Sequence, residues 1–437
     1  MSFGTGLSGL NASAKNLDVI GHNIANANTI GMKAGRAEFS EMFASSLGAA
    51  GGSNGGIGVA VATVATQFSQ GNLKVTGNNM DMAINGDGLF KVRMTDGSTA
   101  YTRDGEFKLD KDGYVITNAG AKVQGYMPAS IGGVIPTGIT SDLKLPTSQA
   151  ITPKQTTGAT AIDPGISLTA NLPANTAAAA YVAPTAPADL TDAQKKYATS
   201  VNVYDQEGNA IPVRISFLHT ATGPSVWTAV ASVYNETTQA WAHENIGTIS
   251  FGPDGKPSAA PALAITPALL TANAVSAGVP SAAWPANIAI GVGDATAGYT
   301  LTQYDADYAV NEMSQTGYAS GELTSISVNE QGVITANYSN GKNMGAGQIA
   351  LARFRNVQGL STLNGGYFQE SAASGQPVEG QPTSGRFGSV RSGALEESNV
   401  DLTAELVNMI VAQRAYQANA QTIKTQDQVQ STLVNLR

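Results

Sequence analysis

Three histidines are the only imidazole groups of this chain, and they are the first residues to test for chemistry. His22, His219 and His243 lie far apart, and none has the His-x-x-x-His spacing or the flanking Glu of a zinc site. The chain has no Cys, which excludes a thiol nucleophile, a disulfide and a thiolate metal site. The sequence therefore predicts no metal centre.

Two further segments have weak likeness to ligand-binding motifs. Asp110-Lys111-Asp112-Gly113 resembles a calcium loop, but Gly stands at the fourth position rather than the sixth and no Glu closes the twelfth. A hairpin turn explains this segment better. The glycines of 51–58 lack the Gly-Lys-Ser/Thr of a phosphate loop, and Gly-x-Ser-x-Gly is absent. We therefore expect no catalytic residue, no cofactor-binding residue and no enzyme activity.

The composition indicates a weakly charged chain that tends to associate. Of 437 residues, 42% are hydrophobic and only 13% are charged, against about 25% in ordinary domains. A net charge of −8 gives no basic footprint for nucleic acid, and no apolar run reaches the ~20 residues of a membrane span. The first residues lack the basic and apolar regions of a cleaved signal peptide. Surfaces with few charges do little to keep molecules apart, so self-association is expected.

Both ends of the chain show the 4,3 spacing of a heptad seam. The seam predicts one helix at each terminus, the second from about Asn399 to Leu436 behind a capping box of Ser398 and Asp401. We expect the two helices to pair with each other as a coiled coil. The assembly residues of this seam are Leu7, Leu10, Leu17 and Ile24 at the N-terminus and Leu402, Leu406, Met409, Tyr416 and Ile423 at the C-terminus.

The C-terminal helix has more apolar surface than one partner covers. Val407, Ile410 and Val411 lie outside the seam, and a helix that is apolar on several faces must be buried on several faces. We expect these three residues to contact neighbouring subunits.

Between the helices the periodicity changes to two, which is typical of strands. Asp96-Gly97, Asp104-Gly105 and Asp112-Gly113 recur every eight residues and separate short alternating segments, as in successive hairpins. A similar pattern returns after residue 318. The expected fold is mainly β with α-helical termini and nested, discontinuous β-domains. Its parts are a helical domain of 1–30 and 396–437, a linker or loop region of 31–70, a β-domain of 71–148 and 318–395, and an inserted outer β-domain of 149–317.

Four motifs, in order along the chain, resemble those of the bacterial flagellar rod and hook proteins. They cover about 200 residues and lie toward both ends of the chain, which makes the resemblance specific. Val201-Asn202-Val203-Tyr204-Asp205 is also similar to the inserted domain of the longer, hook-type members. The four motifs are Leu17-Asp18-Val19-Ile20-Gly21-His22-Asn23-Ile24-Ala25-Asn26 through Lys33, Ala83-Ile84-Asn85-Gly86-Asp87-Gly88, Tyr101-Thr102-Arg103-Asp104-Gly105 through Tyr126, and Gly393-Ala394-Leu395-Glu396-Glu397-Ser398 through Asn419.

The resemblance implies a function as well as a fold. The length and the insertion favour the hook-type members, whose subunits polymerise into a curved tube that acts as a universal joint between motor and filament. It implies an extracellular location, in the hook near the basal body, and export through the flagellar type III apparatus. The implied partners are other copies of the chain, the rod, the hook cap or scaffold protein and the hook–filament junction protein. His22 and Met32 depart from the family's usual residues, and without Cys no covalent cross-link between subunits is possible.

Three alternatives remain open at this point. The chain could be a distal rod or other axial protein, or a surface adhesin whose helices only dimerise. It could also be a displayed enzyme whose site lies in 149–317. The last requires paired carboxylates, and the candidates stand mostly beside turn residues: Asp163, Asp189, Asp192, Asp205, Glu207, Glu236, Glu244, Asp254, Asp294, Asp305, Asp307 and Glu312.

Overall fold

The structure, a computed structural model, divides the chain into two compact units. Unit 1 comprises Met1–Ser148, Leu323–Asn337 and Asn343–Arg437, and unit 2 comprises Gln149–Glu322 and Tyr338–Lys342. The long segment of unit 2 is thus inserted between the first and second segments of unit 1, and its short segment lies between the second and third. The structure describes residues 3–435 except 44–55, 130–131, 137, 147–149, 159, 161–162, 179–180, 183–187, 223–224, 236–238, 274–283, 285 and 295–297.

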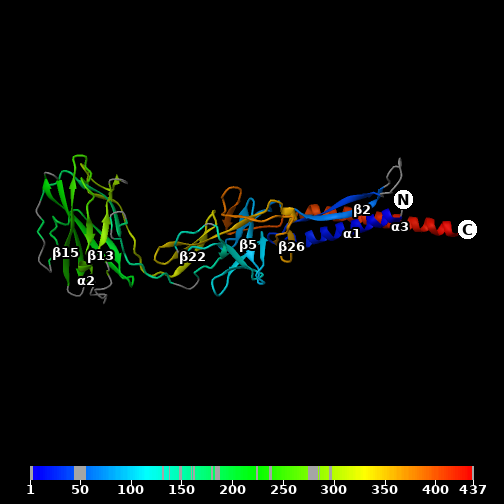
Figure 1. The fold of residues 1–437 in the computed structure, drawn as a ribbon, viewed down its shortest axis with the longest axis horizontal. Coiled ribbons are helices and arrows are strands. Elements are labelled where there is room, and N and C mark those ends of the chain that lie inside the picture. The colour runs from blue at the N-terminus through cyan, green and yellow to red at the C-terminus, as the bar shows by residue number, and fades with distance from the viewer. Residues whose placement is uncertain are drawn as a thin grey trace. The chain divides into compact units, whose positions relative to one another are not determined.

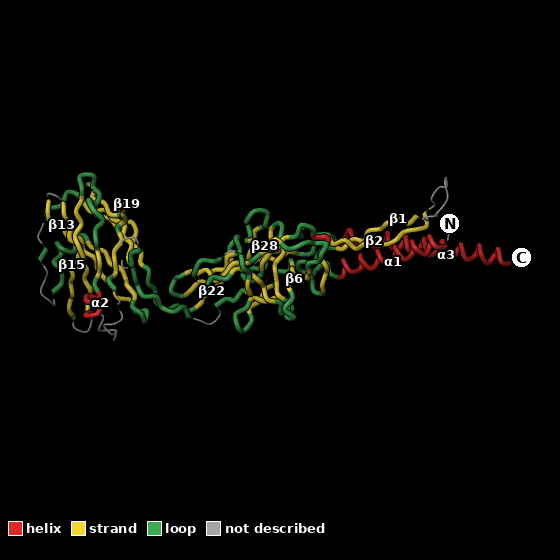
Figure 2. The backbone as a smooth tube through the Cα atoms, in the orientation of Figure 1, coloured by secondary structure: helices red, strands yellow, loops and turns green. Residues whose placement is uncertain are grey.

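Unit 1 joins a helical part to a β-domain. The helices come from the two ends of the chain and lie side by side, with a long hairpin, β1–β2, beside them (Figures 1 and 2). Its elements are α1 (Phe3–Ala25), β1 (Gly35–Phe43), β2 (Gly56–Thr66), β3 (Leu73–Val75), β4 (Met82–Asn85), β5 (Leu89–Arg93), β6 (Thr99–Thr102), β7 (Phe107–Leu109), β8 (Val115–Thr117), β9 (Lys122–Tyr126), β10 (Ser141–Asp142), β22 (Leu323–Val328), β23 (Val333–Tyr338), β24 (Asn343–Ile349), β25 (Leu351–Arg353), the 3₁₀ helix η3 (Val357–Gly359), β26 (Ser361–Leu363), β27 (Tyr367–Gln369), β28 (Val378–Gly380), β29 (Ser389–Ser392), β30 (Ala394–Glu396) and α3 (Leu402–Asn435).

A helix at each end of the chain is confirmed, with one change at the start of α3. The Oδ1 atom of Asp401 accepts hydrogen bonds from the backbone N of Thr403 at 2.9 Å and of Ala404 at 3.1 Å, so Asp401 is the N-cap. Ser398, expected to form a capping box with Asp401, instead accepts from the backbone N of Val400. The helix therefore begins at Leu402, three residues later than predicted.

The segment 31–70, expected to be a linker or loop region, contains the β1–β2 hairpin. The two strands are antiparallel from the pair Gly35–Thr66 to the pair Phe43–Gly56, with two irregularities in register. Of the Gly-rich segment 48–58, residues 48–55 lie outside the described residues, and 56–58 begin β2. The glycines at the start of β2 obscured a strand whose later residues are β-branched or Ala.

The β-domain of unit 1 is built of short strands from before and after the insertion. Its main path is β22-β23-β24-β9-β5-β6-β27-β26, so strands from before and after the insertion are hydrogen-bonded neighbours. Two of the predicted Asp-Gly hairpin turns are present, at residues 96–97 between β5 and β6 and at 112–113 between β7 and β8, and Gly97 and Gly113 have positive φ. The third, at 104–105, is absent, because β6 pairs with β5 and β27 whereas β7 pairs with β8. Leu89, Tyr101, Ala352, Phe354 and Phe368 form one of its buried clusters.

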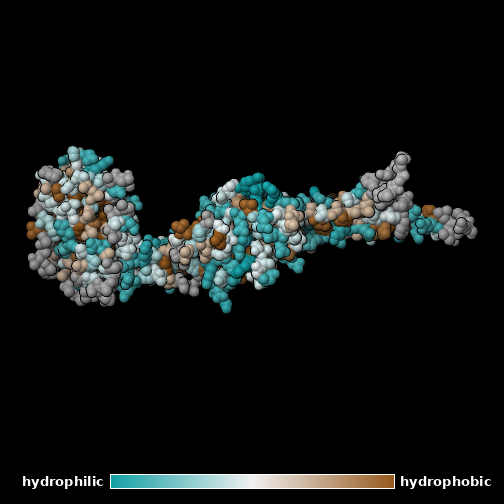
Figure 3. Space-filling view, viewed as in Figure 1, coloured by the Kyte–Doolittle hydropathy of each residue, from teal (hydrophilic) through white to brown (hydrophobic). Residues whose placement is uncertain are grey.

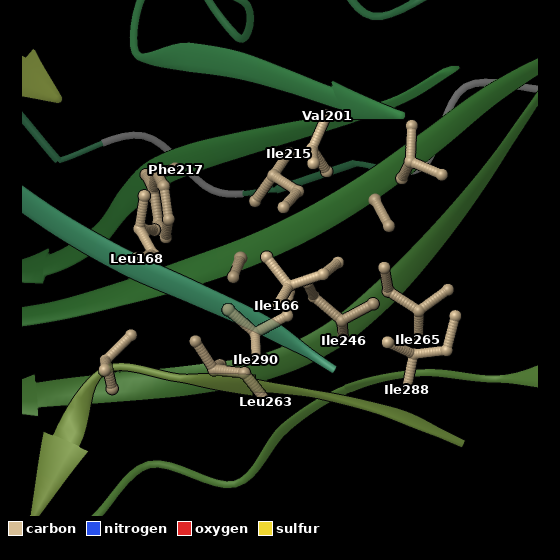
Figure 4. Packing of buried hydrophobic residues seen from close by; sticks show 14 of the residues in the cluster. Ile166, Leu168, Val201, Ile215, Phe217, Ile246, Leu263, Ile265, Ile288 and Ile290 are labelled. Carbon is tan, nitrogen blue, oxygen red and sulfur yellow. The ribbon is translucent and has the colours of Figure 1, made fainter. Parts of the chain in front are cut away.

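Unit 2 consists mainly of two sheets around one core. A four-stranded antiparallel sheet has the order β12-β13-β14-β15, and the second has β16-β17-β11-β20 with β21 on β11. Buried side chains from both sheets form the cluster drawn in Figure 4. The elements of unit 2 are β11 (Ile166–Pro173), β12 (Ala198–Tyr204), β13 (Ala210–Thr222), β14 (Ser225–Asn235), β15 (Ala240–Phe251), β16 (Leu263–Ile265), α2 (Pro267–Asn273), β17 (Ile288–Gly291), β18 (Gly293–Asp294), β19 (Gly298–Tyr299), β20 (Leu301–Tyr304) and β21 (Ala309–Gln315).

The structure confirms the coarse fold class, mainly β with a helix near each terminus. Within the described part of the chain, no helix combines the length and the hydropathy that crossing a membrane requires.

Candidate assembly surface

The two terminal helices run antiparallel and approach each other through small residues of α1. A Cβ placed on Gly6 would lie 3.1 Å from Ile423 Cγ1, and one placed on Gly9 would lie 3.1 Å from the side chain of Asn419. The Nδ2 atom of Asn419 also donates a hydrogen bond to Ser13 Oγ at 3.2 Å. Small residues let helix backbones come close, so this contact is narrow and specific in register.

The hairpin packs on α1 and is fixed to it by polar side chains. Buried Asn23 donates through Nδ2 to the Gly35 carbonyl at 2.8 Å and accepts through Oδ1 from the Gly35 N–H at 2.9 Å. Nearer the start of α1, Ser8 Oγ accepts from the backbone N of Val59 at 3.3 Å. The end of α1 and the beginning of β1 are thereby held in one arrangement.

Several predicted assembly residues do not lie in the contact between the two helices. Leu10, Leu17, Ile24, Met409 and Ile423 are half-buried. By contrast, Leu7, Leu402, Leu406 and Tyr416 of the predicted seam are exposed. Val407, Ile410 and Val411, which we expected to contact neighbouring subunits and not the other helix, are also exposed.

The side of α3 that faces α1 is therefore rotated from the predicted one. The one buried residue in the described part of α3 is Ala412, which is 4% exposed. The heptad spacing predicts that the large Leu residues define the seam. Ile423 of the predicted seam does face Gly6, but Gly9 admits Asn419, which lies outside that seam, because a close approach needs small residues on one side.

Large apolar side chains of α3 are consequently left in solvent in the single subunit. Ile410 is 51% exposed and Val411 61%. The hairpin adds the exposed residues Phe39, Met42, Val61 and Val64, and Figure 3 shows hydrophobic residues recurring along this part of unit 1. An apolar surface of this kind on helices and a hairpin is typical of a protein–protein interface.

A groove lies between α1, the start of the hairpin and α3. It has a volume of about 410 Å³. Glu405 Oε2 is buried there without a hydrogen-bond partner among the described residues. The groove is lined by Asn16, Val19, Ile20, Asn23, Ala34, Gly35, Arg36, Ala37, Gln67, Glu405, Asn408, Val411, Ala412 and Ala415.

Three buried charges join the helical part of unit 1 to its β-domain. Glu396 is fully buried, and its carboxylate accepts from Lys33 Nζ at 2.5 Å and from Arg103 Nη1 at 3.0 Å. The backbone N of Gly71 donates to the same carboxylate at 3.0 Å, and Lys33 Nζ also donates to the carbonyl of Ser69 at 2.8 Å. Burial lowers the pKa of both Lys33 and Arg103, and the charge of Glu396 opposes that shift.

Close backbone contacts surround this cluster. Gly31 has φ of +70°, and a Cβ there would lie 2.5 Å from the backbone N of Asp104. Burial raises the pKa of the Asp104 carboxyl to about 6, although its hydrogen bond from the Glu106 N–H lowers it, and the charges of Glu106 and Asp81 raise it further. This junction has room only for Gly at position 31.

This junction was not predicted from the sequence, although Lys33, Arg103 and Glu396 lie inside the motifs. Lys33 ends the first motif, Arg103 belongs to the third and Glu396 to the fourth. The only sign of it in the sequence was that two of the motifs contain a basic residue, Lys33 or Arg103, and a third contains the carboxylate Glu396. Asn399, also in the fourth motif, adds hydrogen bonds from Ala34 N–H at 2.8 Å and to the Gln67 carbonyl at 2.8 Å.

The residues first considered for chemistry have structural roles. Both unit 2 histidines are hydrogen-bonded within that unit. His219 bonds to Thr176 and Ser225, and His243 bonds to Ser232 and Ala188. His22 is exposed on α1. Asp110 Oδ1 accepts from two backbone N–H groups of the turn between β7 and β8. Among the described residues, no three His, Asp or Glu side chains come together in a group that could hold a metal ion.

Comparison with known proteins first defines a class. Four family models match the chain in order: "Flagella basal body rod protein" over 3–33, "Flagellar hook protein FlgE/F/G D1 domain" over 83–164, "Flagellar basal body protein FlaE D2 domain" over 171–318, and "Flagellar basal body rod FlgEFG protein C-terminal" over 391–436. The paired terminal helices, the β-domain and the inserted domain are thus those of an axial protein of the bacterial flagellum.

Full-length relatives then specify the member of that class. The chain is 36% identical to the flagellar hook protein FlgE of Escherichia coli (strain K12), with 100% of each chain covered. It is 32% identical to the flagellar hook protein FlgE of Borreliella burgdorferi, covering 99% of this chain and 98% of the relative. The chain belongs to the flagellar hook protein (FlgE) family.

A solved structure supports the fold. The crystal structure of Helicobacter pylori flagellar hook protein FlgE2 is similar with a TM-score of 0.56, covering 74% of this chain and 100% of that one at 15% identity. Membership of the hook family, over the full length, decides against the rod, adhesin and enzyme alternatives. The protein is a structural subunit of the flagellar hook, outside the cell, and not an enzyme.

Proposed function

We propose that this subunit polymerises into the curved tube of the hook through its terminal helices and its hairpin. In this proposal α1 and α3 pair as a coiled coil and form the inner wall, and the tube acts as a universal joint that transmits torque from rod to filament. The exposed apolar residues of α3 are the observation that carries the proposal.

The energetics favour burial of these residues by other copies. Complete burial of one Val, Leu or Ile side chain contributes about 1.5–3 kcal/mol. Leu402, Leu406, Val407, Ile410 and Val411 are all exposed in one subunit, so their burial in an assembly is a large driving force. Isolated helices are marginal in water, and α3 has a single buried residue in its described part. We therefore infer that α3 is stabilised mainly by neighbouring subunits.

Two features of α3 support neighbours on more than one side. Gly6 of α1 faces Ile423, yet α3 continues to Asn435 while α1 begins at Phe3. The last turns of α3 therefore extend beyond the α1 contact. In addition, the unpaired Glu405 oxygen in the groove needs a donor, which a neighbouring subunit could supply.

In this proposal each expected domain has its own role in the hook. We assign 1–30 and 396–437 to the helical inner part, 71–148 with 318–395 to the β-domain, and 149–317 to the outer β-domain. The hairpin within 31–70 belongs to the assembly surface instead of a linker. Outer surfaces with few charges allow neighbouring subunits to slide as the tube bends, whereas dense ion pairs would fix one register.

The proposed partners are those of an axial protein. They are other copies of this chain, the rod, the hook cap or scaffold protein, the hook–filament junction protein and the type III export apparatus, with neither nucleic acid nor a membrane as a binding target. The chain has no Cys, so its contacts with them are free of disulfides.

Assembly of the full chain tests the proposal. The triple variant Val407→Ser, Ile410→Ser and Val411→Ser should remain monomeric at concentrations where the unmodified chain forms curved tubes in electron micrographs. Gln413→Ser, Gln417→Ser and Gln421→Ser, all exposed on the same helix, are the matched control and should polymerise. Polymerisation of the apolar triple variant at the normal concentration would refute the proposal, as would polymerisation of a chain without residues 1–30.

A further inference from the structure

A continuous basic and aromatic groove lies on the β-domain of unit 1, apart from the helices. It consists of two adjoining hollows of about 250 and 530 Å³ that share Arg353, Phe354 and Arg355. The first is also lined by Phe68, Asp87, Leu89 and Arg103, and the second by Val378, Ser384, Gly385, Arg386 and Phe387.

Positive charge is concentrated in this groove. Four of the chain's ten arginines line it, in a protein whose net charge is −8. Arg103 is engaged with Glu396, and Arg353 Nε lies 3.6 Å from Asp87 Oδ2. Arg355 and Arg386 are exposed and have no acidic partner within the described part of the chain. The groove thus presents two guanidinium groups that an acidic ligand would neutralise.

The walls of the groove are apolar and fixed in place. Phe354 is buried in edge contact with Tyr101, with ring centroids 4.8 Å apart. Phe387 lies on Gly380, where an added Cβ would be within 2.3 Å of the ring. Val378 beside them is 62% exposed. An occupant should therefore combine carboxylates with apolar side chains.

The exposed part of β1 has this composition. Glu38, Phe39, Glu41 and Met42 lie on one short stretch of strand, and Phe39, Glu41 and Met42 are exposed. Glu38 is paired only with exposed Arg36, and Glu41 has no basic partner among the described residues. Carboxylates next to large apolar residues complement guanidinium groups next to phenylalanines.

A subunit's own hairpin cannot fill its own groove. Phe68 lines the groove just after the end of β2, whereas Glu41 pairs with Val59, nine residues earlier in the chain. A strand rises about 3.3 Å per residue, so Glu41 is about 30 Å from that end of the hairpin, and Glu38, which pairs with Thr63, is about 16 Å from it. The occupant must come from another molecule.

We propose that the acidic stretch of the hairpin, Glu38–Met42, docks into the Arg353–Arg355–Arg386 groove of a second copy of this chain. The contact joins two different surfaces of the same chain, and such head-to-tail contacts build open helical assemblies. The inference rests on the proposed self-assembly and specifies one of its contacts.

Charge exchange in the full-length chain tests the docking. Arg355→Glu with Arg386→Glu should raise the concentration needed for polymerisation by about tenfold or more, and so should Glu38→Arg with Glu41→Arg. All four changes together should restore assembly. Arg391→Glu, exposed and outside the groove, is the matched control and should have little effect. If the groove variant assembles normally while the α3 triple variant does not, the docking is wrong and the proposed function stands.

Cross-linking provides a test that does not need a polymer. Because the chain has no Cys, a Glu41→Cys chain mixed with an Arg386→Cys chain and oxidised can form only a disulfide between introduced residues. We expect a heterodimeric cross-link that weakens as salt is added, and none above background when Arg391→Cys replaces Arg386→Cys. Equal cross-linking of both pairs, or none of either, would overturn the docking.

Discussion

At the scale of single residues, Glu396 has the most demanding environment in unit 1. It is fully buried, and its carboxylate accepts hydrogen bonds from two cations, Lys33 and Arg103, and from the backbone N–H of Gly71. A buried ion pair offers little net stability over an apolar replacement, but the loss of one member leaves the other charges unpaired. The cluster therefore fixes how the helices, the segment around Gly71 and the β-domain meet.

This arrangement predicts a large effect of a small substitution. Glu396→Gln keeps the size of the side chain but removes the charge that Lys33 and Arg103 require, so the free energy of unfolding of unit 1 should fall by about 3–5 kcal/mol. Glu397→Gln is the control, because the Glu397 side chain is 42% exposed and lies 3.9 Å from exposed Lys74; it should change stability by about 0–1 kcal/mol. Urea unfolding followed by far-UV circular dichroism measures both, and equal effects would contradict the account.

Asp104 gives the junction a dependence on pH. Its folded pKa of about 6 lies above the value of about 3.9 in an unfolded chain, so the folded state binds more protons between these values. Stability should therefore fall as pH rises from about 4 through 6 and stay lower at neutral pH. Asp104→Asn, whose side-chain oxygen can still accept from the Glu106 N–H, should remove this part of the dependence.

The measurement is the difference in unfolding free energy between pH 4 and pH 7 for both chains. Asp112→Asn, at an exposed turn, should retain the unmodified profile. A variant at position 104 with an unchanged profile would show that another group causes the loss of stability.

No residue of the junction could be paired from the sequence alone. Lys33 and Glu396 are separated by 363 positions, and periodicity arguments reach only along one element. The motifs marked the residues, whereas their contact depends on how two distant segments fold together.

At the scale of elements, local sequence patterns predicted well which helices and strands exist, but poorly which face of a helix makes contacts. The helices, two of the three predicted Asp-Gly hairpins and strands such as β5 and β12 follow from periodicity and turn residues. The contact side of α3 did not follow, because the small residues Gly6 and Gly9 decide it and a heptad pattern gives weight only to large ones. The hairpin was missed because its second strand begins with glycines.

Two glycines of α1, Gly21 in open space and Gly9 against α3, provide a test of the contact between the helices. A Cβ on Gly21 meets no atom within 4 Å, so Gly21→Ala should stabilise the helix by about 0.5–1 kcal/mol through backbone entropy. Gly9→Ala gains the same entropy but pushes against Asn419 at 3.1 Å, so its net effect should be smaller or destabilising. Thermal melts followed by helical circular dichroism compare the two, and identical stabilisation would mean that α1 and α3 do not touch at Gly9.

At the scale of the whole molecule, the two units have separate cores. The main cluster of unit 2 contains only residues from that unit, and the cluster around Tyr101 only residues from unit 1. A joint that bends requires parts that keep their own structure while their arrangement changes. The nesting could be predicted from the change in composition and periodicity near residues 149 and 318, because segments on the two sides of that change differ in the strands they form and therefore in the core they join.

Separate cores predict separate unfolding transitions, and the chain has built-in probes for each. All three tryptophans, Trp227, Trp241 and Trp284, belong to unit 2, whereas the two long helices of the described residues, α1 and α3, belong to unit 1. Tryptophan fluorescence should therefore follow unit 2, and helical circular dichroism should follow unit 1.

Phe217→Ala removes a buried ring of the unit 2 core and should lower its stability by about 3–5 kcal/mol, moving only the fluorescence transition. Glu396→Gln should move only the circular dichroism transition; if either variant moves both transitions together, the units fold as one and bending must come from elsewhere in the assembly.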